Sequence, residues 1–434
     1  MNFTDVRSKG FTNRIRLKNA IEKGLKEFSK FTDEEIDLRE VSPAKRILSS
    51  DVISKRSIPP FNRSIMDGYA VVASDTAGCS ENNPVTLKIH DKFEIGEIPN
   101  IKVVEGTALR VSTGGILPEG ANAVIMIEDT SLLPEKNDFV EIYTSVHPGI
   151  NVSPCGEDFH KNTLLLKTGK RLKAVDRAFI LSSGNRIIRV SSIPSIGIIS
   201  TGNELSEAWN DELPIGKIPD VNSLNLKELC QEEGWNAEII GIIPDEEELL
   251  KNAIINAASH YDIVILSGGN SVDEKDYVPL LLNNLGKLIF HGVAIRPGGP
   301  VCSAKVEKSI IFGLPGFPTA TVITFYFLIR PILLSLLGMK NYSPLNIKAK
   351  ISRNVGSKLG RLDFLRVKIK KEESGDYYAL PIQIGSSGIL SSIVYGDGLI
   401  MISETSEGLK EGDIVDVVIF SPNIIDYDLS TSIE

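Results

Sequence analysis

The sequence has few of the residues that build metal centres or disulfide frameworks. Its 434 residues include 4 cysteines and 5 histidines. Cys79, Cys155, Cys230 and Cys302 lie far apart, with no CxxC pair and no histidine at the spacing of a zinc site. This pattern argues against a disulfide scaffold and a zinc cluster, and it indicates buried or idle thiols in a reducing compartment.

An excess of positive charge is also missing. The formal net charge is -9, so a broad attraction to nucleic acid or to an anionic membrane is not expected. Residues 1–30 lack an apolar stretch of signal-peptide length. The apolar segment 320–339 carries Arg330 and Pro331 in its middle, which favours a buried helix, broken or kinked at the proline, over a membrane span. We therefore expect a cytoplasmic protein with neither a nucleic-acid nor a membrane partner.

The signature motifs of several common enzyme classes are absent. The chain has no GxxxxGK[ST] phosphate loop, no GxGxxG dinucleotide fingerprint, no HExxH zinc helix and no GxSxG nucleophile elbow. Kinase, dehydrogenase and metalloprotease functions therefore lose their main support.

A chain of this length needs several cores, and the periodicity of its apolar residues changes along it. Helical spacing over residues 14–48 predicts a helical opening with a break near 32–35. Short β-rich runs over 51–143 predict a small β module, and 156–188 indicates a return to the first module. Strands and helices then alternate over 196–266, which is typical of an α/β domain with a largely parallel sheet. Beyond Met339, short β runs and turns predict a compact β domain.

The loops that leave the predicted parallel strands have an unusual composition. In an open α/β sheet, ligands lie outside the carboxyl ends of the strands. Small residues there let backbone N–H groups approach a phosphate. The small and hydroxyl residues that follow two of these strands are Thr201 and Gly202, then Ser267, Gly268, Gly269 and Ser271.

Acidic residues stand in or beside the same loops. Glu204, Asp245 and Asp276 each follow a predicted strand or precede a predicted helix. Three carboxylates near a phosphate site suggest Mg²⁺ bridging the protein and a pyrophosphate. Taken singly, each is more simply explained as a helix cap, by roughly four to one.

Two further loops are stiff and rich in glycine. The segment 296–300 contains Arg296, Gly298 and Gly299, and its guanidinium could clamp a tetrahedral oxyanion. The segment 313–318 alternates glycine with proline, including Pro315 and Pro318, before an apolar helix. By themselves, both loops are better explained as tight structural connections.

The order of these loops resembles that of the molybdopterin molybdenumtransferase family, which includes MoeA and the gephyrin E domain. Residues 59–70 read PPFNRSIMDGYA, close to the family's PPFxxSxMDGYA segment. The resemblance continues over nearly the whole chain, in the same order, through the motifs Ser112-Thr113-Gly114, Gly156-Glu157-Asp158, Ser200-Thr201-Gly202-Asn203-Glu204-Leu205, Asp220-Val221-Asn222, Ser267-Gly268-Gly269, Asp276-Tyr277 and Gly313-Leu314-Pro315-Gly316.

The resemblance implies a multidomain α/β and β protein with four parts. A discontinuous helical and extended module would span residues 1–52 plus 155–190, and a β-rich inserted domain would span 53–154. A central three-layer α/β/α domain with a mostly parallel sheet, which binds molybdopterin, would cover 191–340. A C-terminal β-barrel would cover 341–434. The family forms homodimers with the active site between subunits, so Asp67 would act in trans.

The reaction implied by the resemblance inserts molybdate or tungstate into adenylylated molybdopterin, with release of AMP and assistance from Mg²⁺. A transient contact with the molybdopterin adenylyltransferase would supply the pterin. We expect Glu204, Asp245 and Asp276 to deal with Mg²⁺ and the pyrophosphate, with Pro315 and Pro318 shaping the pocket. The polar residues that would close the site from the partner subunit are Asp67, Thr113 and Asp158.

The C-terminal region carries residues that resemble the family's oxyanion pocket, which implies that Arg361 or Arg366, with Ser391 or Ser392, contacts molybdate. An arginine on a β strand is nevertheless more often solvated or paired with a carboxylate. The chain also departs from the family pattern. Gly299 stands where the family's PGKP loop has lysine, Phe317 where it has asparagine, and Asp273 where it has glycine.

Two alternatives stay open. A molybdopterin adenylyltransferase would use an α/β domain of similar design, but it would need neither the MDGYA module nor the barrel. A non-catalytic scaffold of the same fold is favoured only by the altered lysine and asparagine positions.

Overall fold

The computed structural model describes residues 14–90, 99–133, 138–209, 212–269, 277–340, 342–382 and 389–419. The chain divides into two compact units. Unit 1 comprises Met1–Glu34, Lys45–Ser49 and Val190–Glu434, and unit 2 comprises Glu35–Ala44 and Ser50–Arg189. This division is coarser than the four predicted domains, whose boundaries stay a prediction.

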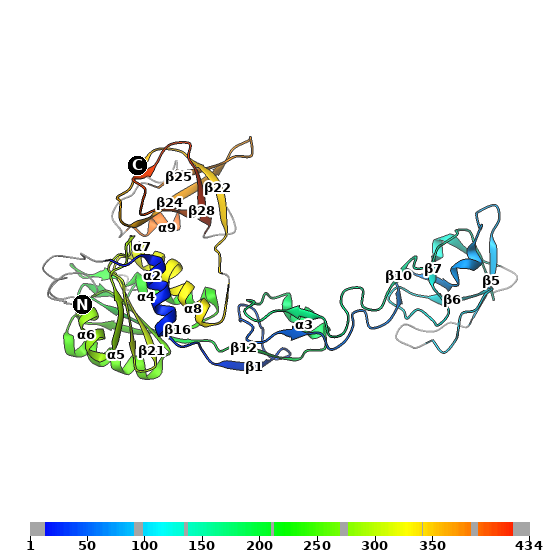
Figure 1. Ribbon diagram of the computed structural model, residues 1–434, viewed down its shortest axis with the longest axis horizontal. Coiled ribbons are helices and arrows are strands. Elements are labelled where there is room, and N and C mark those ends of the chain that lie inside the picture. Colours follow the sequence, from blue (N-terminus) through cyan, green and yellow to red (C-terminus); the bar gives the residue numbers. More distant parts are fainter. Residues whose placement is uncertain are drawn as a thin grey trace. The chain divides into compact units, whose positions relative to one another are not determined.

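Unit 1 is built on a six-stranded sheet in the order β16-β13-β17-β21-β20-β18. Figure 1 labels β16 and β21 of this sheet. The first four strands are parallel, and β20 runs antiparallel to both of its neighbours. The predicted largely parallel sheet is confirmed. The strands are β13 (Ser195–Thr201), β16 (Asn236–Ile243), β17 (Ile263–Ser267), β18 (Lys287–His291), β20 (Cys302–Val306) and β21 (Ser309–Leu314).

Both faces of this sheet are buried, because its strands are almost continuously apolar. Ile198 and Ile265 belong to one core cluster, together with residues of α2 (Leu17–Glu27) and α4 (Val221–Glu233). Ile199 and Val264 belong to the other, with α5 (Glu247–His260) and α6 (Val278–Leu285). Each fully buried isoleucine stabilises the fold by roughly 1.5–3 kcal/mol. The packing holds the strand ends and their loops in place.

The apolar segment near the proline is a buried helix, as predicted. It consists of α7 (Pro318–Thr324), a π-helical turn η3 (Phe325–Ile329) and α8 (Arg330–Leu336). The stretch Pro318–Leu336 is long and apolar enough for a membrane span, but 72% of that window is buried inside the protein. The helix is distorted just before Pro331, where the N–H of Arg330 bonds to the carbonyl of Phe325, since the proline has no N–H of its own.

A closed barrel forms the C-terminal part of unit 1, as predicted. Its five strands run β24-β25-β22-β28-β26, and β26 pairs back with β24. The short strand β19 (Ile295–Arg296), from the α/β part of the chain, pairs with β24 and so adds to the sheet of the barrel. The barrel strands, and a short pair beside them, are β22 (Asn346–Ile351), β24 (Leu362–Lys371), β25 (Tyr377–Pro381), β26 (Gly398–Ile402), β28 (Ile414–Ile419), β23 (Val355–Gly356) and β27 (Gly408–Leu409).

Unit 2 contains a second six-stranded sheet, in the order β7-β4-β6-β5-β9-β8, over a core that includes Tyr69, Ile125 and Val140. The short β runs predicted over residues 51–143 are confirmed, for example at Val85–Ile89. The α-helix α3 (Asp176–Ser182) also belongs to unit 2. The strands and short helices are β2 (Val52–Ile53), β3 (Arg63–Ser64), β4 (Gly68–Val71), η1 (Ala73–Thr76), β5 (Val85–Ile89), β6 (Thr107–Val111), β7 (Ala123–Met126), η2 (Ile127–Asp129), β8 (Thr130–Leu132), β9 (Phe139–Ile142), β10 (Val152–Ser153) and β11 (Leu164–Leu166).

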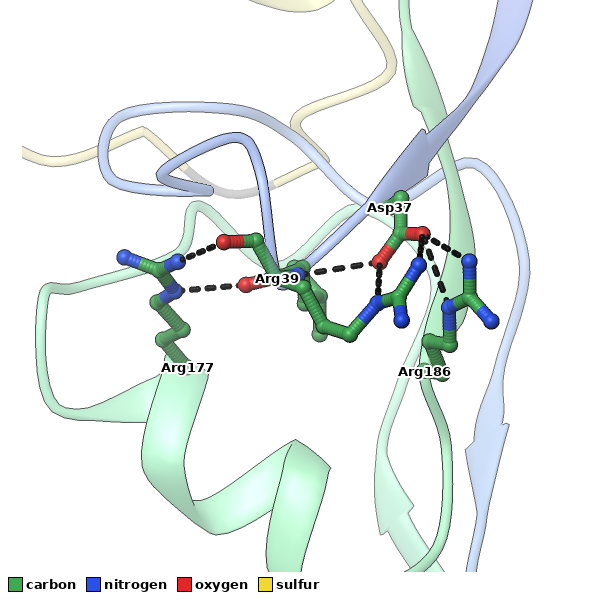
Figure 2. A network of polar contacts seen from close by, with 5 residues as sticks. Asp37, Arg39, Arg177 and Arg186 are labelled. Carbon is green, nitrogen blue, oxygen red and sulfur yellow. Dashed lines mark hydrogen bonds and ion pairs between the residues drawn. The ribbon is translucent and has the colours of Figure 1, made fainter.

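The prediction of helix over residues 14–48 was wrong beyond α2. Residues Asp33–Asp37 form strand β1, which pairs with β12 (Ile187–Ser191). The acidic run that was predicted to break the helix instead lies in this strand, and carboxylates of the strand contact arginine side chains. Asp37 binds Arg39 and Arg186, as Figure 2 shows. Arg186 lies 149 residues from Asp37 along the chain, so local periodicity gave no sign of this contact.

Candidate active site

Loops from three parallel strands meet at the carboxyl edge of the unit 1 sheet. The N–H of Gly268, directly after β17, donates to the carbonyl of Leu314 at the end of β21 (3.0 Å). A Cβ at Gly268 would lie 2.2 Å from the carbonyl oxygen of Thr201, the last residue of β13. Gly268 also has a φ of +104°. Only glycine allows this approach, which brings Thr201, Gly268 and the loop after Leu314 together.

Asp245 is tied to the neighbouring loop. Its Oδ1 accepts a hydrogen bond from the hydroxyl of Thr201 (2.6 Å), and its Oδ2 accepts one from the N–H of Asn203 (3.3 Å). The Asn203 side chain accepts in return from the N–H of Asp245 (3.2 Å). Because the N-cap of α5 is Glu246, the structure does not support helix capping as the reason for Asp245.

Glu204 is exposed in the loop after β13. A Cβ at Gly202 would lie 2.7 and 2.8 Å from its two carboxylate oxygens. The carbonyl of Glu204 accepts from the N–H of Ile218 (2.8 Å), beside the short parallel pair β14 (Leu205–Ser206) and β15 (Ile218–Pro219). Glu204 and Asp245 thus lie in adjoining loops at one sheet edge.

The third carboxylate cannot be placed. Asp276, like Ser271 and the unusual Asp273, lies outside the described residues. Within the described ranges, no group of three His, Cys, Asp or Glu residues is arranged to hold a metal. The two carboxylates that can be placed are oxygen donors of the kind that Mg²⁺ takes. They fit a partial Mg²⁺ site, and the predicted three-residue site stays a prediction.

Asn222 was not selected as a site residue from the sequence, although it lies within the Asp220-Val221-Asn222 motif. Its Nδ2 donates to the Ser267 hydroxyl (2.9 Å) and to the carbonyl of Gly316 (2.8 Å). Asn222 is 7% exposed, and its buried Oδ1 has no hydrogen-bond partner among the described residues. Asp220 positions it by capping α4 through the N–H of Ser223 (3.2 Å). Asn222 therefore joins the β17 loop to the proline-rich loop.

The proline-rich loop after β21 is held from both sides. The hydroxyl of Thr321 donates to the carbonyl of Pro315 (3.0 Å), and Pro318 begins α7. A Cβ at Gly316 would lie 3.8 Å from the Cα of Gly268. Phe317, at the position where the family has asparagine, is 55% exposed. Gly269 also packs closely at this edge of the sheet, since a Cβ there would lie 3.1 Å from the Thr201 methyl group.

Two arginines contact one carboxylate near the place where β19 pairs with β24. Arg296 and Asp363 are register partners, with Nη1 and Oδ2 3.8 Å apart. Arg361 Nε lies 2.9 Å from the other oxygen of Asp363. Arg366 is 4% exposed, and its Nε has no partner among the described residues. Burial, and then the charge of Arg296, lower the pKa of Arg366. We call Arg296, Arg361 and Arg366 the arginine cluster.

The glycines and serines predicted near this cluster have separate structural roles. Gly298 has a φ of +105°, and a Cβ there would lie 2.6 Å from the hydroxyl of Thr324. Ser391 and Ser392 begin the short helix α9 (Ser391–Val394). The buried Ser392 hydroxyl donates to the carbonyl of Ile389 (2.6 Å), while Ser391 is exposed. Because its proton is already donated, the Ser392 hydroxyl could only accept a hydrogen bond from a ligand. The hydroxyl of the exposed Ser391 could donate or accept one.

In unit 2, the MDGYA segment brings two predicted residues into contact. The N–H of Thr113 donates to Oδ1 of Asp67 (2.8 Å). Both residues are exposed. Gly68 lets β4 lie close to β7, because a Cβ there would lie 1.8 Å from the carbonyl oxygen of Ile125. The strand pairing thus fixes the backbone on which Asp67 stands.

Asp158 is held by its backbone to the segment that precedes the MDGYA motif. Its N–H donates to the carbonyl of Ile58 (3.0 Å). Asn62 links the segments further, because its Oδ1 accepts from the N–H of Cys155 (2.8 Å) and its carbonyl accepts from the N–H of Leu117 (2.8 Å). The Asp158 side chain is exposed. Asn62 is not among the predicted site residues, because its role depends on contacts far along the chain.

Comparison with known proteins identifies the chain's relatives. Residues 15–184 match the MoeA N-terminal region (domain I and II), 197–335 a model described as "Probable molybdopterin binding domain", and 348–420 the MoeA C-terminal region (domain IV). A Methanocaldococcus jannaschii protein assigned to molybdopterin biosynthesis is 37% identical over 415 residues, which cover 93% of this chain and 98% of that protein. The chain belongs to the MoeA family.

Other MoeA relatives agree over most of their length. The molybdopterin molybdenumtransferase of Haemophilus influenzae is 31% identical, covering 87% of this chain and 92% of its own. A solved MoeA structure from Pyrococcus horikoshii OT3, described as a molybdopterin biosynthesis protein, is 30% identical with a TM-score of 0.79. It covers 94% of this chain and 100% of its own. The resemblance that the motifs predicted is therefore confirmed.

Proposed function

We propose that this chain is a molybdopterin molybdenumtransferase of molybdenum cofactor biosynthesis, which inserts molybdate or tungstate into adenylylated molybdopterin and releases AMP. Membership of the MoeA family supports this function, since relatives that match most of the chain carry that name. The observation that carries the proposal is the sheet edge at which Thr201, Asp245 and Gly268 meet. It has the position and composition of a phosphate-binding site.

The chain's own residues would bind and orient the pterin pyrophosphate. Glycine at positions 202, 268 and 269 would let the pyrophosphate approach the backbone of the strand-end loops. Asn222 joins the loop after β17 to the proline-rich loop. Glu204 and Asp245, with Asp276, would hold Mg²⁺, which neutralises phosphate charge when bound. Pro315 and Pro318 would limit the movement of the pocket wall.

The arginine cluster is the proposed binding site for the oxyanion substrate. Its guanidinium groups can donate paired N–H groups to the oxygens of a tetrahedral dianion. Gly298 and Gly299 keep side chains away from this loop, and the exposed hydroxyl of Ser391 is a further candidate donor. Arg366 is buried, and its Nε has no partner among the described residues, so a bound anion would give that N–H an acceptor.

We further propose that the protein acts in the cytoplasm as a homodimer, with Asp67, Thr113 and Asp158 of one subunit completing the site of its partner. The direct bond between Asp67 and Thr113 supports a common role for these two residues. A transient contact with the adenylyltransferase would deliver the pterin. The homodimer and this contact rest on the family resemblance.

The proposed function is tested by incubating the full-length protein with adenylylated molybdopterin, Mg²⁺ and either molybdate or tungstate. We expect AMP release that depends on the oxyanion. If the pterin binds but neither oxyanion promotes AMP formation, the transferase proposal fails and the scaffold alternative is favoured. Formation of adenylylated molybdopterin from molybdopterin and ATP would instead indicate the adenylyltransferase.

A further inference from the structure

An aromatic side chain is exposed in the proline-rich loop beside the proposed pyrophosphate site. Phe317 follows Gly316 and is 55% exposed, whereas residues 319–324 of α7 are all buried. A single exposed apolar residue is common on a protein surface and does not by itself indicate a site. The position of this ring, and the way its backbone is held, give it a further meaning.

The backbone on both sides of Phe317 is fixed. Phe317 has a φ of -82° and a ψ of 128°, the extended conformation that the following proline favours. Its carbonyl accepts hydrogen bonds from the N–H of Thr321 (3.0 Å) and from the Thr321 hydroxyl (3.2 Å). The carbonyl of Gly316 accepts from Nδ2 of Asn222 (2.8 Å). The ring therefore stands on a preorganised loop, and a ligand that lay against it would cost little backbone freedom.

The loop places Phe317 between two parts of unit 1. A Cβ at Gly316, one residue earlier, would lie 3.8 Å from the Cα of Gly268, where the pyrophosphate is proposed to bind. Two residues later, the hydroxyl of Thr319 donates to the carbonyl of Ile389 (3.0 Å), which precedes α9. Phe317 thus lies along the chain between the strand-end loops and the contact with the segment before α9.

A second observation at the same loop also points to a ligand. Asn222 is 7% exposed, and its Oδ1 has no hydrogen-bond partner among the described residues. Its Nδ2 already donates to Ser267 and Gly316, so Oδ1 is the acceptor that a bound N–H group would satisfy. Planar nitrogen heterocycles offer N–H donors at their edges and a face on which an aromatic ring can stack.

We propose that Phe317 is a specificity-determining residue whose ring stacks on a planar nitrogen heterocycle attached to the bound pyrophosphate. Adenylylated molybdopterin carries two such rings, the pterin and the adenine, and this identification rests on the proposed function. Asparagine, which the family has at this position, offers hydrogen bonds but no aromatic face. Recognition at this point of the site is therefore by stacking in this chain.

The test compares three diphosphates that share the charged group and differ in the ring. The full-length protein is titrated with inorganic pyrophosphate, ADP and hydroxymethylpterin diphosphate, by calorimetry and, for the pterin, by fluorescence quenching. We expect Phe317→Leu to weaken binding of one or both heterocyclic diphosphates by about ten-fold and to leave inorganic pyrophosphate unchanged. Phe317→Trp, which keeps an aromatic face, should retain the affinity. Leu345→Ala is the matched control, since it shortens an apolar side chain that is 68% exposed elsewhere.

Salt separates stacking from charge. Raising the salt concentration should weaken binding of all three diphosphates, while the ratio between the unaltered protein and Phe317→Leu stays nearly constant. Equal affinities of these two proteins for both heterocyclic diphosphates, or an equal loss for inorganic pyrophosphate, would overturn the proposal, as would no binding of either heterocyclic diphosphate. Binding that depends on Phe317, without AMP release driven by an oxyanion, would support the stacking contact and count against the proposed function alone.

Discussion

The hydroxyl of Thr201 donates a hydrogen bond to Oδ1 of Asp245 at 2.6 Å, across 44 residues of sequence. It joins the last residue of β13 to the loop that follows β16. Thr201 is 3% exposed, so its side chain cannot swing away into solvent. The bond therefore sets the direction in which the Asp245 carboxylate points.

If Asp245 holds Mg²⁺ as proposed, Thr201→Val should lower Mg²⁺ affinity or AMP release by roughly 10–100-fold, because the hydroxyl that orients the carboxylate is lost while the side-chain shape is kept. Thr201→Ser is the matched control, since it retains the hydroxyl. Mg²⁺ dependence of AMP release measures the effect. Equal Mg²⁺ dependence of Thr201→Val and Thr201→Ser would mean that Asp245 does not need this donor.

Gly268→Ala should disrupt the meeting of the strand-end loops. The added Cβ would lie 2.2 Å from the backbone oxygen of Thr201, which cannot move without displacing β13. Gly338→Ala is the control, since Gly338 also has a positive φ but has open space around it. We expect the control to cost about 1 kcal/mol and Gly268→Ala to cost clearly more. Thermal unfolding of both variants would decide, and equal melting temperatures would contradict the steric argument.

Asp67→Asn and Glu204→Gln should each abolish most AMP release when tested alone. If the site is shared between subunits, mixing the two inactive proteins should recover part of the activity, because some mixed dimers contain one unaltered site. Glu204→Gln mixed with Glu204→Gln carrying a second tag controls for the exchange procedure. A mixture that exchanges subunits yet stays inactive would exclude action of Asp67 in trans.

The Asp37 network in Figure 2 predicts acid sensitivity of unit 2. Hydrogen bonds from Arg186, and then from the N–H of Arg39, hold the pKa of Asp37 well below its usual range. A carboxylate with a lowered pKa contributes stability above its unfolded pKa of about 4, and that contribution is lost as the pH falls further. Asp37→Asn should therefore weaken this region at neutral pH and make it less sensitive to acid.

Hydrogen exchange in peptides covering residues 35–44 would measure this effect, because the N–H of Leu38 bonds to the carbonyl of Arg186 (2.9 Å). We expect faster exchange in Asp37→Asn at neutral pH, and a difference from the unaltered protein that shrinks progressively as the pH falls below about 4. Glu105→Gln, an exposed acidic residue elsewhere in unit 2, should change nothing. Unchanged exchange in Asp37→Asn at neutral pH would show that the network adds no local stability.

Much of the fold could be predicted from the sequence because it depends on short-range pattern. The continuous apolar runs at Ile196–Ser200 and Ile263–Leu266 predicted buried parallel strands, and the run near Pro331 predicted a buried helix. The prediction failed at Asp33–Asp37, where acidic residues form a strand instead of a helix break. There the deciding contacts, such as Asp37 with Arg186, span 149 residues.

The family, the parallel sheet and the glycine-rich loops at its carboxyl edge could be inferred from the sequence alone, because local periodicity and ordered motifs indicate backbone conformation and buried faces. Which side chains contact one another follows from the folded chain. It paired Asp245 with Thr201 and gave Asn222 its two partners. Such contacts join distant segments of the chain, and their geometry follows from how strands and helices pack rather than from any local pattern.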